Sequence, residues 1–92
     1  MYKIIYRPSS LNDINEIFDY ISVDNLQVAI KVQETIFNFI NYLAIFPMLW
    51  KQNWNWFNLR EIIEPAFKYR IIYQIENDTI FIIWVFKNKN LY

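Results

Sequence analysis

Apolar residues recur every three or four positions along two stretches in the first half of the chain. The first stretch follows Arg7-Pro8, and its apolar positions have the spacing of one helical face: Leu11, Ile14, Ile17, Phe18 and Ile21. The second begins at Asp24-Asn25 and runs to Phe46-Pro47, where the residue before proline should leave the helix: Ala29, Val32, Ile36, Phe39, Ile40 and Leu43. A turn of about three residues separates the stretches, so the pattern predicts an antiparallel helical hairpin.

The start of the first helix has polar residues that suit a helix N-terminus. Ser9 or Ser10 is the predicted N-cap, because a serine hydroxyl can accept a hydrogen bond from a free backbone N–H. Ser10 and Asp13 also have the spacing of a capping box, with aspartate in place of the usual glutamate.

The remaining segments are rich in β-branched and aromatic residues and predict strands at 2–6, within 54–63, at 69–75 and at 80–86. Asn77-Asp78 suits a two-residue hairpin turn, and Glu64-Pro65-Ala66 suits a turn between two strands. Residues 80–86 are apolar throughout, which is typical of a central strand covered on both faces.

The order of these elements, β-α-α-β-β-β, predicts an α+β fold. We expect the helical hairpin to pack on one face of a four-stranded, mainly antiparallel sheet, within a single domain that spans residues 1–92. The other face of the sheet should be left partly open, and a functional site is most reasonably sought there.

Composition narrows the chemistry that this chain can perform. It has no cysteine and no histidine, so thiolate metal sites and the commonest general base are excluded, and we expect no metal and no cofactor. Nine basic and nine acidic residues give a net charge of zero, which does not indicate a strongly basic nucleic-acid binder. Residues 1–46 carry a net −2 and residues 47–92 a net +2, so the second half is the better candidate for meeting an anion.

No apolar run approaches the roughly 18–20 residues of a membrane-spanning helix. The opening residues, MYKIIYRPSS, are too polar and too short in their apolar part for a signal peptide. We therefore expect no membrane contact and a cytoplasmic protein.

Several motifs, taken in order, resemble the RelE/ParE family of toxins from bacterial type II toxin–antitoxin systems. The first is Ser-x-x-x-Asp-Ile-x-x-Ile-x-x-Tyr-Ile, which starts at Ser9, and the second helix ends in Tyr42-Leu43-x-x-Phe46-Pro47. The later matches are Leu59-Arg60-Glu61-Ile62, then Tyr69-Arg70-Ile71-Ile72-Tyr73-Gln74-Ile75, then a hairpin into residues 80–86. The resemblance covers nearly the whole chain.

This resemblance implies two alternative activities on one fold, so function has to be argued from the site. ParE-like members inhibit DNA gyrase without being nucleases, and RelE-like members cut messenger RNA at the ribosome. Members commonly carry a histidine at the end of the last strand, where this chain has Phe86, which cannot accept a proton. We therefore favour a ParE-like toxin that inhibits gyrase by binding. A RelE-like endoribonuclease and a decayed toxin that only binds its antitoxin remain alternatives.

The predicted target-binding residues are Arg60, Arg70, Lys87 and Lys89. Strand alternation places Tyr69, Ile71, Tyr73 and Ile75 on the helix-covered face and Arg70 on the open face, although Arg70 could instead pair with Glu61, Glu64 or Glu76. In the nuclease alternative, Arg60 and Arg70 would stabilise the phosphate charge, and Glu61 or Tyr92 would have to serve as the base.

Three tryptophans lie within residues 50–57, WKQNWNWF. Trp56 is expected in the core, whereas Trp54 could be either core or exposed, and Trp50 should cover the end of the helical hairpin. The resemblance implies an antitoxin that wraps the toxin, and tryptophan is favoured at such contacts, so Trp54 and Trp50 are the predicted antitoxin-binding residues. Stacking on RNA bases is a third alternative.

Overall fold

The computed structural model describes residues 2–46 and 59–87, which form two helices and four strands. The strand β1 (Lys3–Tyr6) precedes α1 (Pro8–Ser22) and α2 (Leu26–Leu43), and β2 (Leu59–Ile63), β3 (Tyr69–Glu76) and β4 (Thr79–Lys87) follow. The predicted order β-α-α-β-β-β is confirmed, as is the short turn between the two helices. Trp50, Trp54, Trp56, Lys89 and Tyr92 lie outside the described residues.

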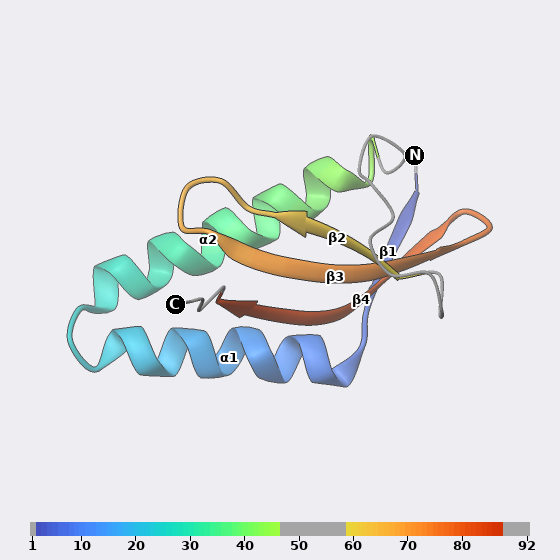
Figure 1. The fold of residues 1–92 in the computed structure, drawn as a ribbon. Helices are drawn as coiled ribbons and strands as arrows, with labels where there is room; N and C mark the ends of the chain where they lie inside the picture. The colour runs from blue at the N-terminus through green and yellow to red at the C-terminus, as the bar shows by residue number, and fades with distance from the viewer. Residues whose placement is uncertain (1, 47–58, 88–92) are drawn as a thin grey trace.

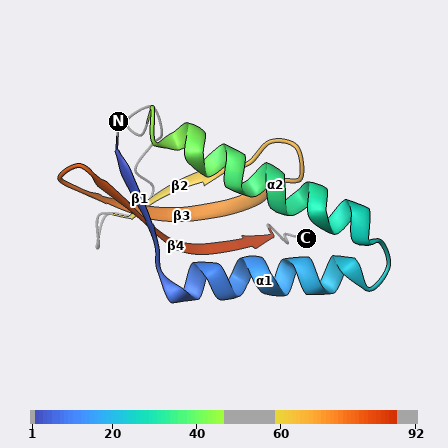
Figure 2. The same ribbon diagram turned by 180° about the vertical axis from the view of Figure 1, so that it is seen from behind.

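The four strands form one sheet in the order β1-β4-β3-β2 (Figures 1 and 2). The β2–β3 and β3–β4 pairs are antiparallel and β1 pairs with β4 in parallel, so the sheet is mainly antiparallel, as predicted. A parallel neighbour requires a long crossover, and the helical hairpin supplies it. Ile4, near the start of the chain, thereby lies beside Ile80 of the last strand.

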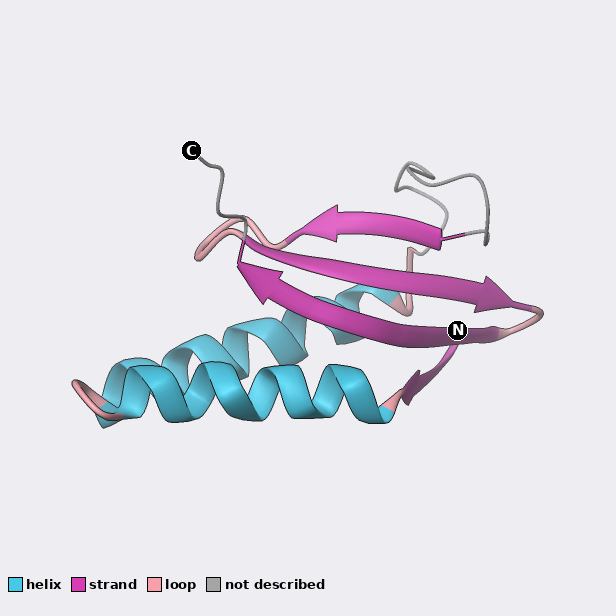
Figure 3. Cartoon of the chain, turned by 60° about the horizontal axis from the view of Figure 1, so that its bottom comes forward, coloured by secondary structure: helices cyan, strands magenta, loops and turns pink. Residues whose placement is uncertain are grey.

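Both helices cover the same face of the sheet, and no described helix lies on the other face (Figure 3). The core fills the space between the two layers with side chains from α1, α2 and the inward positions of the strands: Ile14, Val32, Ile36, Ile40, Leu43, Ile62, Tyr69, Ile71, Tyr73, Ile80, Ile82 and Val85. On β3 the inward set contains Tyr69, Ile71 and Tyr73, so the predicted alternation is confirmed.

Two turns of this glycine-free chain need positive φ, and non-glycine residues supply it. Asn77 has φ of 56° in the predicted β3–β4 hairpin. Lys68 has φ of 67° in the β2–β3 turn, where the buried carboxylate of Glu64 accepts hydrogen bonds from the backbone N–H groups of Ala66 (2.5 Å) and Phe67 (2.9 Å). Both turns lie where the sequence predicted them.

The central position of β4 is confirmed, but the expectation that it is covered on both faces is wrong at its C-terminal end. Trp84 is 41% exposed and Phe86 is 39% exposed, on the face that the helices do not cover. The apolar run therefore combines a buried set of residues with an exposed aromatic set.

The N-cap of α1 is Arg7, not Ser9 or Ser10, and no capping box forms. Pro8 occupies the first turn, where its missing N–H costs nothing, and the helix starts two or three residues earlier than predicted. Ser10 is buried, and its hydroxyl donates to the carbonyl of Arg7 at 2.7 Å. The side chains of Ser9 and Asp13 are thereby free to contact the sheet.

The second helix begins as predicted, because Asn25 Oδ1 accepts a hydrogen bond from Val28 N at 3.1 Å. It ends at Leu43, before the predicted stop at Phe46. The carbonyl of Ala44 instead accepts from Tyr2 N at 3.1 Å, so the chain leaves the helix where it meets the start of β1. No helix in the described part of the chain is both long and apolar enough to cross a membrane.

Side chains of α1 continue along the edge of β4 where β1 stops. β1 pairs only with residues 79–82 of β4, and the register then shifts by a bulge at Ile83. The Ser9 hydroxyl donates to the carbonyl of Ile83 at 2.5 Å, and Asp13 Oδ2 accepts from Val85 N at 2.9 Å. Two polar side chains therefore satisfy strand-edge groups that β1 is too short to reach.

The Asp13 contact yields a stability prediction. Asp13→Ala should lower the free energy of unfolding by about 2 kcal/mol, because a hydrogen bond from a backbone N–H to a carboxylate is lost. Asp13→Asn keeps an oxygen acceptor and should cost less. Urea denaturation provides the measurement, and Asp19→Ala, an exposed position of the same helix, is the matched control. Equal losses for Asp13→Ala and Asp19→Ala would contradict this role.

The buried tyrosines yield a pH prediction. Burial raises the pKa of Tyr73 to about 12, although the positive charge of Arg60 acts in the opposite direction. A raised folded-state pKa gives stability that is complete below the unfolded value of 10.0 and is lost as the pH rises through about 12. The unfolding free energy of Tyr73→Phe should therefore fall by roughly 2 kcal/mol less than that of the parent protein as the pH rises to 12. Denaturation curves measured from pH 9 to 12 would refute the assignment if the variant and the parent protein fell equally steeply.

Candidate functional site

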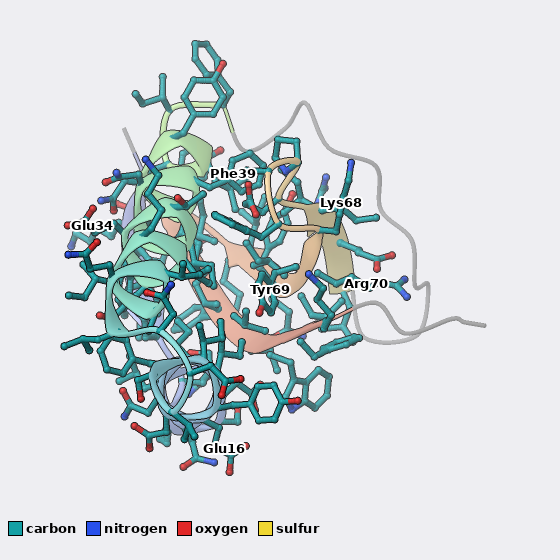
Figure 4. All side chains as sticks on the ribbon, turned by 90° about the vertical axis from the view of Figure 1, so that its left-hand side faces the viewer. Glu16, Glu34, Phe39, Lys68, Tyr69 and Arg70 are labelled. Atoms are coloured by element: carbon teal, nitrogen blue, oxygen red, sulfur yellow. The ribbon has the colours of Figure 1, made fainter. Side chains whose placement is uncertain are left out.

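The open face of the sheet carries one arginine on β3, as the alternation predicted. Arg70 lies opposite Ile63 of β2 and Phe86 of β4, and the next outward position of β3, Ile72, lies opposite Glu61 and Trp84. Figure 4 views the molecule along the helices and shows Tyr69 on the helix side and Arg70 farther from the helices. Neighbouring residues of one strand thus serve the core and the outer surface.

Arg70 is held in place by an acid and an aromatic ring. Its Nε donates to Glu61 Oε2 across the β2–β3 pair, and its guanidinium carbon lies 5.7 Å from the centre of the Phe86 ring. The hydrogen bond to Glu61 raises the pKa of Arg70, against the opposing effect of burial. The pairing with Glu61, one of the three acids that the sequence offered, is therefore the observed one.

The Glu61 side chain is almost fully enclosed, with 5% of its surface exposed, whereas Arg70 keeps 28%. A buried carboxylate needs a partner of opposite charge or several hydrogen bonds, and Arg70 provides both a charge and a donor. Glu61 is thus committed to orienting Arg70. The contact that this geometry shows for Glu61 is a structural one, which points its carboxylate at Arg70.

Three exposed apolar side chains surround Arg70: Ile63 at 45%, Trp84 at 41% and Phe86 at 39% exposure. We call these residues together with Arg70 the Arg70 patch. It crosses β2, β3 and β4 at the end of the sheet that lies near the β2–β3 turn. The positive charge of Arg70 is neutralised by Glu61, and the exposed side chains around it are apolar.

Arg60 does not join this patch. It lies opposite Tyr73 of β3, on the face that the helices cover, and it shares that face with Ile62. Its positive charge acts on the hydroxyl of Tyr73. The two arginines that the sequence grouped as target-binding residues therefore lie on opposite faces of the sheet.

Lys87 also turns away from the Arg70 patch. Its Nζ donates to the carbonyl of Phe67 and lies 4.7 Å from the centre of the Tyr69 ring, on the helix side of the sheet. Of the predicted target-binding and antitoxin-binding residues, Lys89, Trp50 and Trp54 are outside the described part of the chain.

Two outward-facing residues were missed when the sequence was read. Trp84 follows from the same alternation that placed Arg70, but the unbroken apolar run around it concealed its exposure. Arg7 lies with its guanidinium carbon 4.6 Å from the centre of the Phe81 ring, and its position directly after β1 was the available signal. Among the described residues no group of three or more metal-ligating side chains comes together.

Comparison with known proteins identifies the fold and the family. Three solved structures share the architecture at 13–16% sequence identity: the chromosomal ParDE toxin–antitoxin system from P. aeruginosa, the intact E. coli RelBE toxin–antitoxin complex and the isolated E. coli RelE toxin. In the same order, the TM-scores are 0.84, 0.70 and 0.71. The matches cover 97%, 98% and 99% of this chain, and 98%, 100% and 88% of the chains in the solved structures. No curated protein sequence matches.

The family model for the ParE toxin of the type II toxin–antitoxin system parDE matches residues 4–92. This match spans every described helix and strand except Lys3, the first residue of β1. The chain therefore belongs to the ParE family of toxins from type II toxin–antitoxin systems.

Proposed function

We propose that this ParE-family toxin inhibits its target by binding through the Arg70 patch, and that the target is DNA gyrase. The supporting observation is the composition of the patch: one oriented arginine, charge-matched by Glu61, among the exposed side chains of Ile63, Trp84 and Phe86. Tryptophan and arginine are the residues that dominate binding energy at protein–protein interfaces, especially where an apolar surround excludes water.

The same composition does not favour RNA cleavage. Attack by a 2′-hydroxyl requires a base and uncompensated positive charge near the scissile phosphate. Arg70 is charge-compensated by Glu61, Arg60 lies on the opposite face, and the chain has no histidine. A phosphate would have to compete with a buried carboxylate for the Arg70 guanidinium.

The partner that controls the toxin is proposed to be a cognate antitoxin protein. The ParDE and RelBE structures with the same fold are named as toxin–antitoxin systems. Trp50 and Trp54 remain the proposed antitoxin contacts, Lys89 a proposed target contact, and the cytoplasm the proposed site of action.

Pulse-labelling after induction of the toxin alone in a bacterial host tests the proposed target. DNA synthesis should fall before protein synthesis, because gyrase inhibition stops replication first. An earlier fall in protein synthesis would overturn the gyrase proposal and favour the RelE-like endoribonuclease. If neither falls in a host whose gyrase binds the protein, the chain is a decayed toxin.

Substitution within the Arg70 patch tests the proposed surface. Trp84→Ala should weaken inhibition of gyrase supercoiling at least about tenfold, the effect of losing one interface hot spot. Because Trp84 is partly exposed, the variant should still fold. Tyr42→Ala removes a similarly exposed aromatic side chain from α2 and is the matched control. Equal inhibition by the parent protein, Trp84→Ala and Tyr42→Ala would exclude the Arg70 patch as the contact with gyrase.

Loss of Arg70 itself should combine two effects. Arg70→Ala leaves the Glu61 carboxylate buried without its guanidinium, so unfolding free energy should fall by about 3 kcal/mol. Adding Glu61→Gln should restore part of this loss without restoring inhibition. A double-mutant cycle by urea denaturation, with inhibition assays on the same proteins, separates folding from target binding. Full inhibition by the double variant would contradict a contact role for Arg70.

A further inference from the structure

A groove with a volume of about 690 Å³ runs between α1 and the C-terminal end of β4. The helix contributes the acidic side chains of Asp13 and Glu16 and the apolar side chains of Ile17 and Ile21. The sheet contributes Tyr69, Val85, Phe86 and Lys87. The groove therefore has an apolar floor and an acidic wall.

The sheet side of this groove is a strand edge that α1 satisfies only in part, through Ser9 at the Ile83 carbonyl and Asp13 at the Val85 N–H. β1 stops at the partner of Ile82, so residues 83–87 of β4 have no neighbouring strand on that side in the described structure. Val85 N points toward α1, since it donates to Asp13, and both backbone groups of one residue point to the same side of a strand. The Val85 carbonyl and, two residues on, the Lys87 N–H thus face the groove.

The charge of the groove is not balanced by its own residues. The helix α1 contains Asp13, Glu16 and Asp19 and no lysine or arginine. Lys87 lines the sheet side of the groove, with its amine against the Phe67 carbonyl and the ring of Tyr69, and its single positive charge does not balance the two carboxylates of Asp13 and Glu16. A ligand in the groove consequently meets net negative charge along one wall.

Two exposed aromatic side chains flank the groove and extend its apolar surface. Tyr20, on α1, is 83% exposed, and Phe86 is 39% exposed. An apolar surface beside an acidic wall and an open strand edge suits an occupant that presents apolar side chains, basic side chains and backbone groups together.

We propose that this groove binds an extended peptide segment of a partner protein, carrying lysine or arginine between apolar residues, as an added strand that pairs with β4 between Val85 and Lys87, beyond the contacts of Ser9 and Asp13. The backbone of the segment pairs with the Val85 carbonyl and the Lys87 N–H. Its apolar side chains pack on Ile17, Ile21 and Phe86, and its basic side chains meet Glu16 and Asp13. This binding does not depend on the identity of the toxin's target.

The test uses the full chain and two synthetic octapeptides, one alternating valine with lysine and one alternating valine with glutamate. Calorimetry should give a dissociation constant below about 1 mM for the lysine peptide and at least tenfold weaker binding for the glutamate peptide. Glu16→Lys should weaken binding of the lysine peptide about tenfold. Glu34→Lys, an exposed site on the outer side of α2 (Figure 4), should change it little.

Hydrogen exchange distinguishes an added strand from other modes of binding. The Lys87 amide should become protected when the lysine peptide binds, because it gains a carbonyl partner, whereas a helix lying in the groove would leave it exposed. The proposal is overturned if the lysine peptide does not bind at about 1 mM, if Glu16→Lys and Glu34→Lys weaken binding equally, or if binding leaves the Lys87 amide unprotected.

Discussion

The hydrogen bond from Val85 N to Asp13 holds α1 against the edge of β4 at the point where β1 no longer covers it. β1 has four residues and β4 has nine, so the parallel pair alone leaves half of a central strand with an open edge. Unpaired backbone groups at such an edge must find other partners or water. After the bulge at Ile83 these groups face α1, where Ser9 donates to the Ile83 carbonyl and Asp13 accepts from the Val85 N–H. The helix therefore lies beside the sheet edge as well as over its face.

The outer face shows a different solution for a charged residue in an apolar strand. Arg70 is flanked by Ile63 and Phe86 and is neutralised by Glu61, whose side chain is almost fully buried. A buried pair of this kind contributes little net stability compared with apolar residues of equal size, because both charges lose hydration. What the pair does provide is a fixed orientation for one guanidinium on an otherwise apolar surface. The fold is thus compatible with protein recognition at this place.

Local periodicity explains which features could be predicted from the sequence. The helices, the hairpin turn at Asn77 and the outward direction of Arg70 depend on neighbours a few residues away, and all were found. The face of Arg60 was not fixed, because β2 has apolar residues at both inward and outward positions. The partners of Asp13 and Lys87 could not be found either, because Val85 and Phe67 approach them only through the folded topology. The tryptophan-rich segment between α2 and β2 lies outside the described residues, so the roles of Trp50, Trp54 and Trp56 stay predictions.

The groove and the Arg70 patch share one residue, and this has a thermodynamic consequence. Phe86 lines the groove along α1 and also lies 5.7 Å from the Arg70 guanidinium. A ligand that fixes the Phe86 ring in one position therefore changes the surroundings of Arg70, and a ligand on Arg70 acts on the groove by the same free energy, because coupling between two binding sites is reciprocal. The direction of this coupling depends on whether both ligands need the same orientation of the ring. A histidine at this position would add a titratable group to both surfaces, whereas phenylalanine links them through packing alone.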